Sequence, residues 1–346
     1  MAGGRGTRFW PLSRITKPKQ FLRILSDKTL LEETVKRISP LVPFDRTYIV
    51  TARSHFKEVL RLLPTFPRSN VLVEPEGRNT AAAIGLAAIT LSKSNPEAVM
   101  VVLPSDHVIR EGKRFIQSVR VAVGLAQRSD KLVTIGIKPT RPETGYGYIK
   151  KGAKVSASRG IHVYEACGFK EKPALKVAER YVKSKEYLWN SGIFVWKAGV
   201  IVERLQKWMP ELSERLDRIR RHGSQKSIAE AYRRMPSVSI DRGVLEREKS
   251  LWLVEADLAW SDVGSWQAAG EIWGAAGRPA YRGNVVSVES EGVIAHSPQR
   301  LIALLGVKDL IVVDSQDAVL IADRSRAQDV GMIVSELQRR RQRSFL

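Results

Sequence analysis

The 346-residue sequence has a single cysteine, only five histidines and no long hydrophobic run. One cysteine, Cys167, excludes an internal disulfide framework and fits a reducing compartment. The longest apolar stretches, such as Val99–Leu103, have the length of a strand and fall far short of a membrane span. The first residues contain no basic segment followed by an apolar one, so no secretory signal is expected in them. We therefore expect a cytoplasmic protein without a membrane partner.

Acidic residues are scarce relative to basic ones. The chain has 57 Lys and Arg against 36 Asp and Glu, a net charge of +21. Nucleic-acid-binding proteins usually concentrate such charge in a stripe or tail. Here the basic residues are scattered, with short clusters only at Arg218–Arg221 and Arg339–Arg343, on helix-like segments where a solvated face is the commoner explanation. We expect no nucleic-acid partner, and a positive field that suits anionic substrates.

The usual metal and nucleophile patterns are also missing. The five histidines show no close spacing of the kind that zinc sites use. Cys167 lies in an alternating strand pattern, where a small buried residue is more common than a nucleophile.

Strand-like and helix-like segments alternate through the first two-thirds of the chain. The strand-like runs are Thr47–Val50, Val71–Val73, Val99–Leu103 and Leu132–Ile137, and the helix-like stretches are Leu30–Ile38, Ser54–Leu63, Thr80–Ser92 and Arg114–Gln127. This alternation predicts βαβ units and a mostly parallel sheet with helices on both faces. Ligands of such folds bind along the edge where the strands end.

The pattern changes twice further along. From about Tyr146, strand-like pieces surround a helix-like segment, Ala174–Ser184, which indicates an inserted layer over the open sheet edge. These pieces are Tyr146–Lys150, Ile161–Lys170 and Ile193–Trp196. After Tyr281, short hydrophobic steps resemble the rungs of a small β-helix or sandwich, closed by a helix from about Arg326 to Arg341. The prediction is an α/β fold with a doubly wound, mixed sheet over residues 1–275 and a small β-helix-like domain over residues 281–346.

A glycine-rich segment opens the sequence. Gly3, Gly4 and Gly6 allow backbone N–H groups to approach an anion, and Arg8 and Lys19 supply positive charge for a polyphosphate. The spacing is neither a Walker A motif nor the dinucleotide fingerprint. A flexible terminal turn is the alternative, but the basic residues and a Trp-Pro pair just downstream favour a phosphate loop.

The motifs together resemble the sugar-1-phosphate nucleotidyltransferases. The start Gly3-Gly4-Arg5-Gly6-Thr7-Arg8, with Pro11-Leu12 and Lys19, is similar to the signature of that family. Further blocks resemble its mannose-1-phosphate guanylyltransferase branch: Phe9–Arg14, Pro18–Leu22, Glu74–Ala81, Leu103–His107, Phe169–Pro173, Trp189–Gly192 and Trp260–Trp266. The resemblance spans about residues 1–346, and it implies a Rossmann-like sheet of the nucleotide-diphospho-sugar transferase type.

The resemblance also implies a reaction. GMP is transferred from GTP to mannose 1-phosphate, giving GDP-mannose and pyrophosphate. The sugar-phosphate oxygen attacks the α-phosphate, so alignment and charge neutralisation carry most of the catalysis. Mg²⁺ is the implied cofactor, because it prefers carboxylates, waters and phosphate oxygens. GTP and mannose 1-phosphate are the expected partners, and a homodimer is left open.

Two carboxylates are candidates for the metal. Asp106 follows the strand-like run Val99–Leu103, and Asp262 precedes a helix-like segment that begins near Gly264. A turn-forming aspartate and a helix N-cap are the ordinary alternatives for these two residues. The resemblance favours the metal role for both.

The remaining site residues follow from the same resemblance. Arg8, Lys19 and Lys172 are the expected catalytic residues. Asn79 and Thr80 precede a helix, so an N-cap role is compatible with nucleotide contact. The expected nucleotide-binding residues are Ala2, Gly3, Gly4, Gly6, Thr7, Arg8, Lys19, Asn79, Thr80, Ser105 and Asp106; the expected sugar-phosphate-binding residues are Gly145, Glu171, Lys172 and Asn190.

The sequence departs from the family pattern in two places. Arg242-Gly243 stands where a Tyr-Ala pair is expected, which concerns the detail of the sugar site. Only Met1 and Ala2 precede Gly3, where a hydrophobic strand is normal. We therefore expect the true start upstream and a vacant slot in the sheet, with unpaired backbone groups on both flanking strands. No isomerase extension follows the β-helical region, so a single activity is expected.

Two alternatives remain open. One is a glucose-1-phosphate uridylyl- or thymidylyltransferase, against which Trp189–Gly192 and Arg78–Thr80 argue. The other is a silent relative that senses sugar nucleotides, which loss of Arg8, Lys19, Asp106, Lys172 or Asp262 would favour; all five are present.

Overall fold

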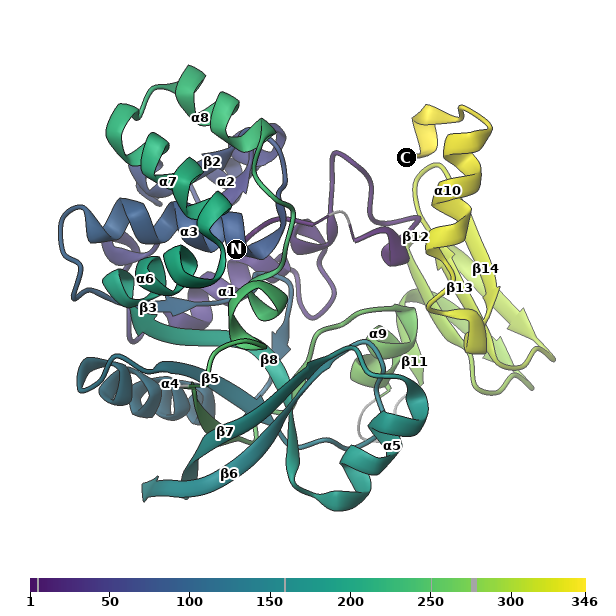
Figure 1. The fold of residues 1–346 in the computed structure, drawn as a ribbon. Helices are drawn as coiled ribbons and strands as arrows, with labels where there is room; N and C mark the ends of the chain where they lie inside the picture. The colour runs from purple at the N-terminus through teal and green to yellow at the C-terminus, as the bar shows by residue number, and fades with distance from the viewer. Residues whose placement is uncertain (5, 159, 250, 275–278) are drawn as a thin grey trace. The chain divides into compact units, whose positions relative to one another are not determined.

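The computed structural model describes residues 1–4, 6–158, 160–249, 251–274 and 279–346 (Figure 1). Their contacts divide the chain into two units. The first comprises Met1–Gly3, Lys36–Pro104 and Ile109–Trp260, and the second comprises Gly4–Val35, Ser105–Val108 and Ser261–Leu346. The domain boundary expected at residue 275 lies outside the described residues. No helix among those described is both long enough and apolar enough to span a bilayer.

The first unit contains a six-stranded sheet in the order β3-β8-β5-β9-β7-β6. The strands of this unit are β1 (Ile49–Ala52), β2 (Val71–Glu74), β3 (Val99–Val102), β5 (Leu132–Ile137), β6 (Gly147–Ser158), β7 (Ile161–Glu171), β8 (Tyr187–Lys197) and β9 (Leu251–Ala256). Within the six, only the β5–β9 pair is parallel. The expected mixed sheet is confirmed, but the expectation of a mostly parallel one is wrong.

The cause is the position of β8. This strand runs antiparallel between β3 and β5, so it separates two strands that consecutive βαβ units would have placed side by side. It extends over 11 residues, well beyond the Ile193–Trp196 run expected from the sequence. The β6–β7 hairpin that precedes it also pairs antiparallel.

The strands β1 and β2 form a separate parallel pair. Beside β1, the backbone N–H of Ala2 donates to the carbonyl of Val50 at 2.8 Å. Beyond β3, the amino group of Met1 donates to the carbonyl of Leu103 at 2.8 Å. No strand among the described residues pairs with the open side of β1 or of β3 beyond these contacts. The structure therefore has the predicted gap in the sheet between these two strands.

Helices cover both faces of the six-stranded sheet (Figure 1). The helix α1 (Leu30–Ile38) is divided between the two units. The other helices of this unit are α2 (Phe56–Leu62), α3 (Asn79–Ser92), α4 (Gly112–Gln127), α5 (Leu175–Ser184), α6 (Ala198–Trp208), α7 (Pro210–His222) and α8 (Gln225–Arg233). One core cluster lies on the side of α3, α6 and α7, and the other lies on the side of α4.

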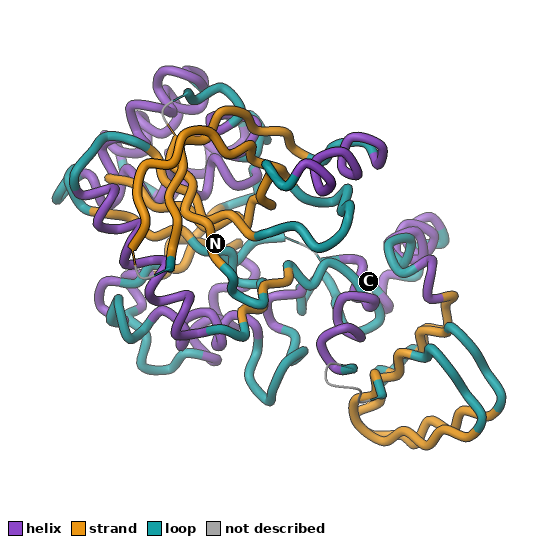
Figure 2. The backbone as a smooth tube through the Cα atoms, turned by 90° about the horizontal axis from the view of Figure 1, so that it is seen from below, coloured by secondary structure: helices purple, strands orange, loops and turns teal. Residues whose placement is uncertain are grey.

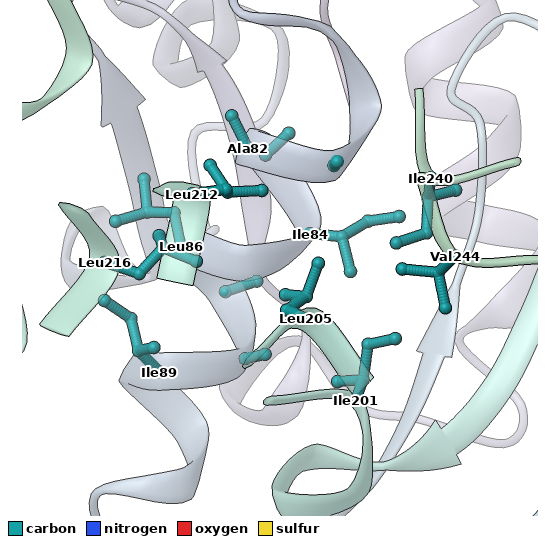
Figure 3. Packing of buried hydrophobic residues seen from close by; sticks show 14 of the residues in the cluster. Ala82, Ile84, Leu86, Ile89, Ile201, Leu205, Leu212, Leu216, Ile240 and Val244 are labelled. Atoms are coloured by element: carbon teal, nitrogen blue, oxygen red, sulfur yellow. The ribbon is translucent and has the colours of Figure 1, made fainter. Parts of the chain in front are cut away.

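The helix α3 is buried around almost its whole circumference, because its sequence from Ala81 to Ile89 is entirely apolar. Figure 3 shows Leu86 and Ile89 beside Leu216 of α7, and Ile84 beside Ile240 and Val244. Small residues let the helices approach closely.

The second unit contains a four-stranded sheet in the order β11-β12-β13-β14, visible as a coil of strands in Figure 2. Its elements are β11 (Ala280–Val288), β12 (Ile294–Leu305), β13 (Leu310–Asp314), β14 (Val319–Asp323), α9 (Trp266–Trp273) and α10 (Gly331–Arg339), with β4 (Val108–Ile109) and β10 (Trp260–Ser261) at its borders. The first three strands pair in parallel, as the rungs of a β-helix do. The expected terminal helix is shorter than predicted, since the 3₁₀ turn Arg324–Arg326 and a further turn over residues 327–330 precede its start at Gly331.

A hydrophobic core joins the two sequence ends of this unit. Phe9 and Trp10, just after the glycine-rich segment, pack in one buried cluster with Trp266, Ile311 and other residues of the β-helix. The indole N–H of Trp266 donates to the carbonyl of Trp10 at 3.0 Å. The segment that follows the glycine-rich start is therefore held by the C-terminal part of the chain.

Cys167 is exposed, and its thiol lies 3.4 Å from the carbonyl of Lys151. The expectation of a small buried residue is wrong. Register shifts between β6 and β7, beginning at Lys150 and Lys151, interrupt the alternation from which burial was inferred.

Candidate active site

Lys19 packs closely against the backbone of the glycine-rich segment at Gly6. Gly6 has φ +59°, and a Cβ added there would lie 2.5 Å from the Cβ of Lys19. A side chain at residue 6 is therefore excluded both by conformation and by space. The hydroxyl of Ser13 donates to the carbonyl of Gly6 at 2.8 Å, which fixes the turn.

Lys19 connects the two predicted metal-binding aspartates. Its ammonium lies 3.0 Å from Oδ2 of Asp106 and donates to the backbone carbonyl of Asp262. The Lys19 side chain is 9% exposed, so this charge is almost entirely withdrawn from water. Burial alone would raise the pKa of Asp106, but Lys19 and then His107 outweigh it and hold that pKa below its ordinary value.

Asp262 sits at a strained turn. Val263 has φ +46°, a conformation that β-branched residues rarely adopt, and its N–H donates to the hydroxyl of Ser261 at 3.0 Å. A Cβ built on Gly264 would lie 2.8 Å from Oδ2 of Asp262 and 3.4 Å from Nη1 of Arg8. The Asp262 carboxylate and the Arg8 guanidinium therefore flank a glycine that leaves no room for a side chain.

The simpler explanation of Asp262 does not hold. Ser265, not Asp262, occupies the N-cap position of α9.

The guanidinium of Arg8 donates to the amide oxygen of Gln328 at 2.6 Å, so the position of Arg8 is set from the C-terminal part of the same unit.

The donor set fits a hard divalent cation that keeps most of its own waters. The described residues contain no cluster of three or more His, Cys, Asp or Glu that could enclose a metal. The Asp106 carboxylate beside Lys19, and the Asp262 carboxylate on the turn whose backbone carbonyl Lys19 also contacts, suit Mg²⁺, which proteins commonly bind through one or two carboxylates plus substrate phosphates. They would not suit zinc, which takes a closed set of nitrogen and sulfur ligands.

The other expected nucleotide residues differ in environment. Ser105, next to Asp106 in the chain, is buried, and its hydroxyl makes no hydrogen bond with any described residue. A buried hydroxyl of this kind normally has a polar partner. Gly3 and Gly4 are exposed, and Gly4 has φ +101°. Ala2 is fully buried in the first unit, whereas Thr7 begins a 3₁₀ turn in the second.

Asn79 and Thr80 begin α3 in the first unit, but neither caps it. Arg78 occupies the N-cap position and makes no side-chain capping bond. The Asn79 side chain accepts from the N–H of Thr80 at 2.9 Å, and the Thr80 hydroxyl accepts from the N–H of Ile240 at 2.9 Å. The capping role expected from sequence is wrong, and the φ of +67° at Asn79 marks a strained position.

The first unit gathers three of the expected sugar-site residues. Glu171 ends β7, Lys172 follows it, and Asn190 lies on β8. A Cβ on Gly147 would lie 2.6 Å from Oε2 of Glu171 and 3.3 Å from Cβ of Asn190, so both side chains border this glycine. Gly145, the fourth, donates its N–H to Glu143 at 3.1 Å.

Asp241 belongs to this group, although no sequence motif includes it. Its carboxylate accepts from the side-chain amide of Asn190 at 2.7 Å. It begins a π-helical turn, Asp241–Leu245, an element that often marks functional positions. The only sequence signal was its place beside the departure at Arg242-Gly243. Gly243 fits there because a Cβ would meet the sulfur of Met209.

The carboxylates of this group are mutually destabilised when charged. Burial, and then the neighbouring Asp241, raise the pKa of Glu171 to about 6, against the lowering effects of Lys172 and Arg242. Burial likewise raises the pKa of Asp241, against a hydrogen bond from its own backbone and one from Asn190. Lys172 lies 3.7 Å from Glu171 and has φ +47°, a further strained position. The group offers acceptors and one cation to a polar, anionic ligand.

Comparison with known proteins places these motifs in a family. A family model described as nucleotidyl transferase matches residues 1–275, and one described as MannoseP isomerase/GMP-like beta-helix domain matches residues 283–337. A protein of Escherichia coli K12 named mannose-1-phosphate guanylyltransferase is 39% identical over 98% of this chain and 72% of its own length. The xanthan biosynthesis protein XanB of Xanthomonas campestris pv. campestris B100 is 38% identical over the same shares.

A solved structure agrees with these relatives. The crystal structure described as mannose-1-phosphate geranyltransferase from Thermus thermophilus superposes with a TM-score of 0.84 and 33% identity, over 98% of each chain.

Proposed function

We propose, from the premise that this chain belongs to the mannose-1-phosphate guanylyltransferase family of nucleotidyl transferases, that it transfers GMP from GTP to mannose 1-phosphate. A phosphate oxygen of the sugar phosphate attacks the α-phosphorus of GTP. The bond between the α-phosphorus and the bridging oxygen breaks, and pyrophosphate leaves with that oxygen. The observation that carries the proposal is the buried Lys19 ammonium held between Asp106 and Asp262.

The positive charges of Lys19 and Arg8 neutralise the triphosphate of GTP. Lys19 is the buried cation, and Arg8 lies beside Asp262. Asp106 and Asp262 hold Mg²⁺ when it is bound, and the ion supplies charge neutralisation at the phosphate oxygens. The low pKa of Asp106 keeps it ionised for that role at neutral pH.

The glycines of the loop let backbone N–H groups approach the phosphates, and the unpartnered hydroxyl of Ser105 donates to the nucleotide. Asn79 and Thr80 contact the nucleotide from the start of α3.

The second group recognises the sugar phosphate. Lys172, more than half exposed, binds its phosphate as a point charge. Glu171 and Asn190 bind hydroxyls, and Asp241 orients the Asn190 amide so that its oxygen faces away from Asp241. Gly145 brings backbone close to the sugar. Because hydroxyl orientation is what distinguishes hexoses, this group determines which sugar is used.

A pyrophosphate-release assay across four nucleoside triphosphates and several sugar phosphates tests the proposal. With Mg²⁺, release from GTP should require mannose 1-phosphate. Equal or faster turnover with UTP and glucose 1-phosphate would overturn the choice of sugar and base but not the reaction. Absence of turnover with every pair, under conditions where the protein is folded, would favour a silent sugar-nucleotide sensor. We place the reaction in the cytoplasm, in keeping with a single cysteine.

A further inference from the structure

The first unit has a groove of about 1080 Å³ that none of the expected site residues lines. Its walls come from the segment around α2, from β2, from α3 and from the end of α7. We call it the basic groove, for the five cations that line it: Arg53, Lys57, Arg68, Lys93 and Arg220.

No carboxylate is among the residues that line the basic groove. Arg220 pairs with Asp217 at 3.0 Å, and the guanidinium of Arg68 lies over the ring of Phe56 at 5.1 Å. Within the part of the chain that the structure describes, Arg53 and Lys57 form no ion pair. Arg53 and Lys57 are like charges without such a counter-charge and repel one another, so an anion in the groove would relieve that repulsion.

Apolar residues also line the basic groove, and we call them its floor. They include Leu72 and Val73 of β2, which are partly exposed, and the more deeply buried Leu86 and Ile89 of α3, which Figure 3 shows beside α7. Such a floor offers burial to a flat ring but few groups to read its polar edges. A cationic rim over an apolar floor therefore selects a ligand that is anionic at one end and apolar at the other.

We propose that the basic groove is a second binding site, which takes a phosphorylated small molecule carrying a flat ring, that is, a nucleotide. The ring lies on the apolar floor and against the Arg68 guanidinium, and the phosphates pair with Arg53 and Lys57. The groove is large enough, since small-molecule sites occupy about 300–1,000 Å³. The proposal does not depend on the reaction assigned above.

Calorimetric titration with ADP tests the site, because an apolar floor should not discriminate between bases. The test variant is Arg53→Glu with Lys57→Glu, two exposed positions whose reversal should not disturb folding. The matched control is Lys113→Glu with Arg120→Glu, which makes the same change in net charge at exposed positions of α4. ADP should bind at least tenfold more weakly to the test variant than to the control, with pyrophosphate release alike in both.

Equal ADP affinity in the two variants, or no measurable ADP binding to the wild-type protein, would overturn the proposal. Inorganic pyrophosphate separates charge from ring, since it carries the phosphates alone. It should bind the groove at least tenfold more weakly than ADP. Pyrophosphate binding as tight as that of ADP, and equally lost in the test variant, would mean that the apolar floor takes no part.

Discussion

Single residues at or next to the expected site positions hold backbone conformations that their side chains disfavour. Asn79, Lys172 and Val263 all have positive φ, and each is an expected site residue or the neighbour of one. Such positions cost roughly 1–3 kcal/mol each and persist where the surrounding structure imposes them. Their location agrees with the motifs found in the sequence, although the motifs carried no conformational information.

Replacing Asp262 by Asn tests the metal role at the residue scale. The change keeps the shape and removes the charge, so turnover should fall by a factor on the order of 10² or more, with thermal stability near that of the wild type. Asp106→Asn should behave alike, and the double variant should be no slower than the slower single variant if both side chains hold one ion. Asp27→Asn, an exposed position of the same unit, is the control and should retain full activity. Near-wild-type rates for Asp262→Asn would contradict the role.

Glu171 should make sugar-phosphate binding depend on pH. Its pKa of about 6 means that the carboxylate is lost as pH falls through 6, and with it a charged acceptor for hydroxyls. KM for mannose 1-phosphate should rise several-fold between about pH 7.5 and about pH 5.5. The substrate phosphate also titrates in this range, so Glu171→Gln is the reference: its KM should already be high at the upper pH and change less. Parallel pH profiles in the two proteins would show that Glu171 does not bind the sugar as a carboxylate.

At the scale of elements, the β-helix packs against the segment that follows the glycine-rich start. Ile311 of β13 is fully buried in the cluster that contains Phe9 and Trp10. Ile311→Ala should cost about 2–5 kcal/mol of unfolding free energy and should also raise KM for GTP, because the segment after the loop loses its support. Leu301→Ala, at a strand position that is 67% exposed, is the control and should change neither quantity appreciably. A destabilised Ile311→Ala protein with unchanged KM for GTP would show that GTP binding does not depend on the packing of the β-helix.

The element boundaries show where local patterns are reliable. The helix Leu30–Ile38 and the strand Leu132–Ile137 have the bounds predicted from periodicity. The run Ile193–Trp196 proved to be the end of the longer β8. Two hydrophobic steps that the sequence shows as separate, Val293–Ile294 and Leu301–Leu305, proved to belong to the single strand β12. Periodicity reports a strand where one face is buried, and β8 is buried along most of its length on both faces.

For the whole molecule, two buried groups set opposite pH dependences of stability. Burial raises the pKa of Glu74 to about 7, against the lowering effect of Tyr232, so the folded state gains stability at low pH that is lost as pH rises through 7. Burial, and then Arg282, lower the pKa of His296 to about 4, so stability is lost as pH falls from 6.5 towards 4.

Denaturant unfolding at about pH 8 and about pH 4.5 can separate these two effects. Relative to the wild type, Glu74→Gln should gain roughly 2–3 kcal/mol more at the higher pH than at the lower, from a shift of about two to three pKa units. His296→Gln should show the opposite sign, gaining more at the lower pH than at the higher. A difference between the two pH values that is the same for both variants and the wild type would show that neither group titrates on unfolding.

The sequence by itself determined the chemistry of this protein. Glycines that only a tight turn requires, a lysine and two aspartates at the ends of local segments, and the order of the blocks can all be read without a structure. The same holds for the α/β alternation and the change to short rungs after Tyr281. These features depend on residues that are near one another in the chain, so their pattern survives in the sequence.

The tertiary structure alone decided which distant segments meet. It placed β8 antiparallel between β3 and β5, joined Asp241 to Asn190 across 51 residues, and packed Phe9 against Trp266. It also opened a basic groove between segments whose charges looked scattered. Strand pairing and core packing are non-local, because the free energy of each contact depends on partners that local periodicity does not specify.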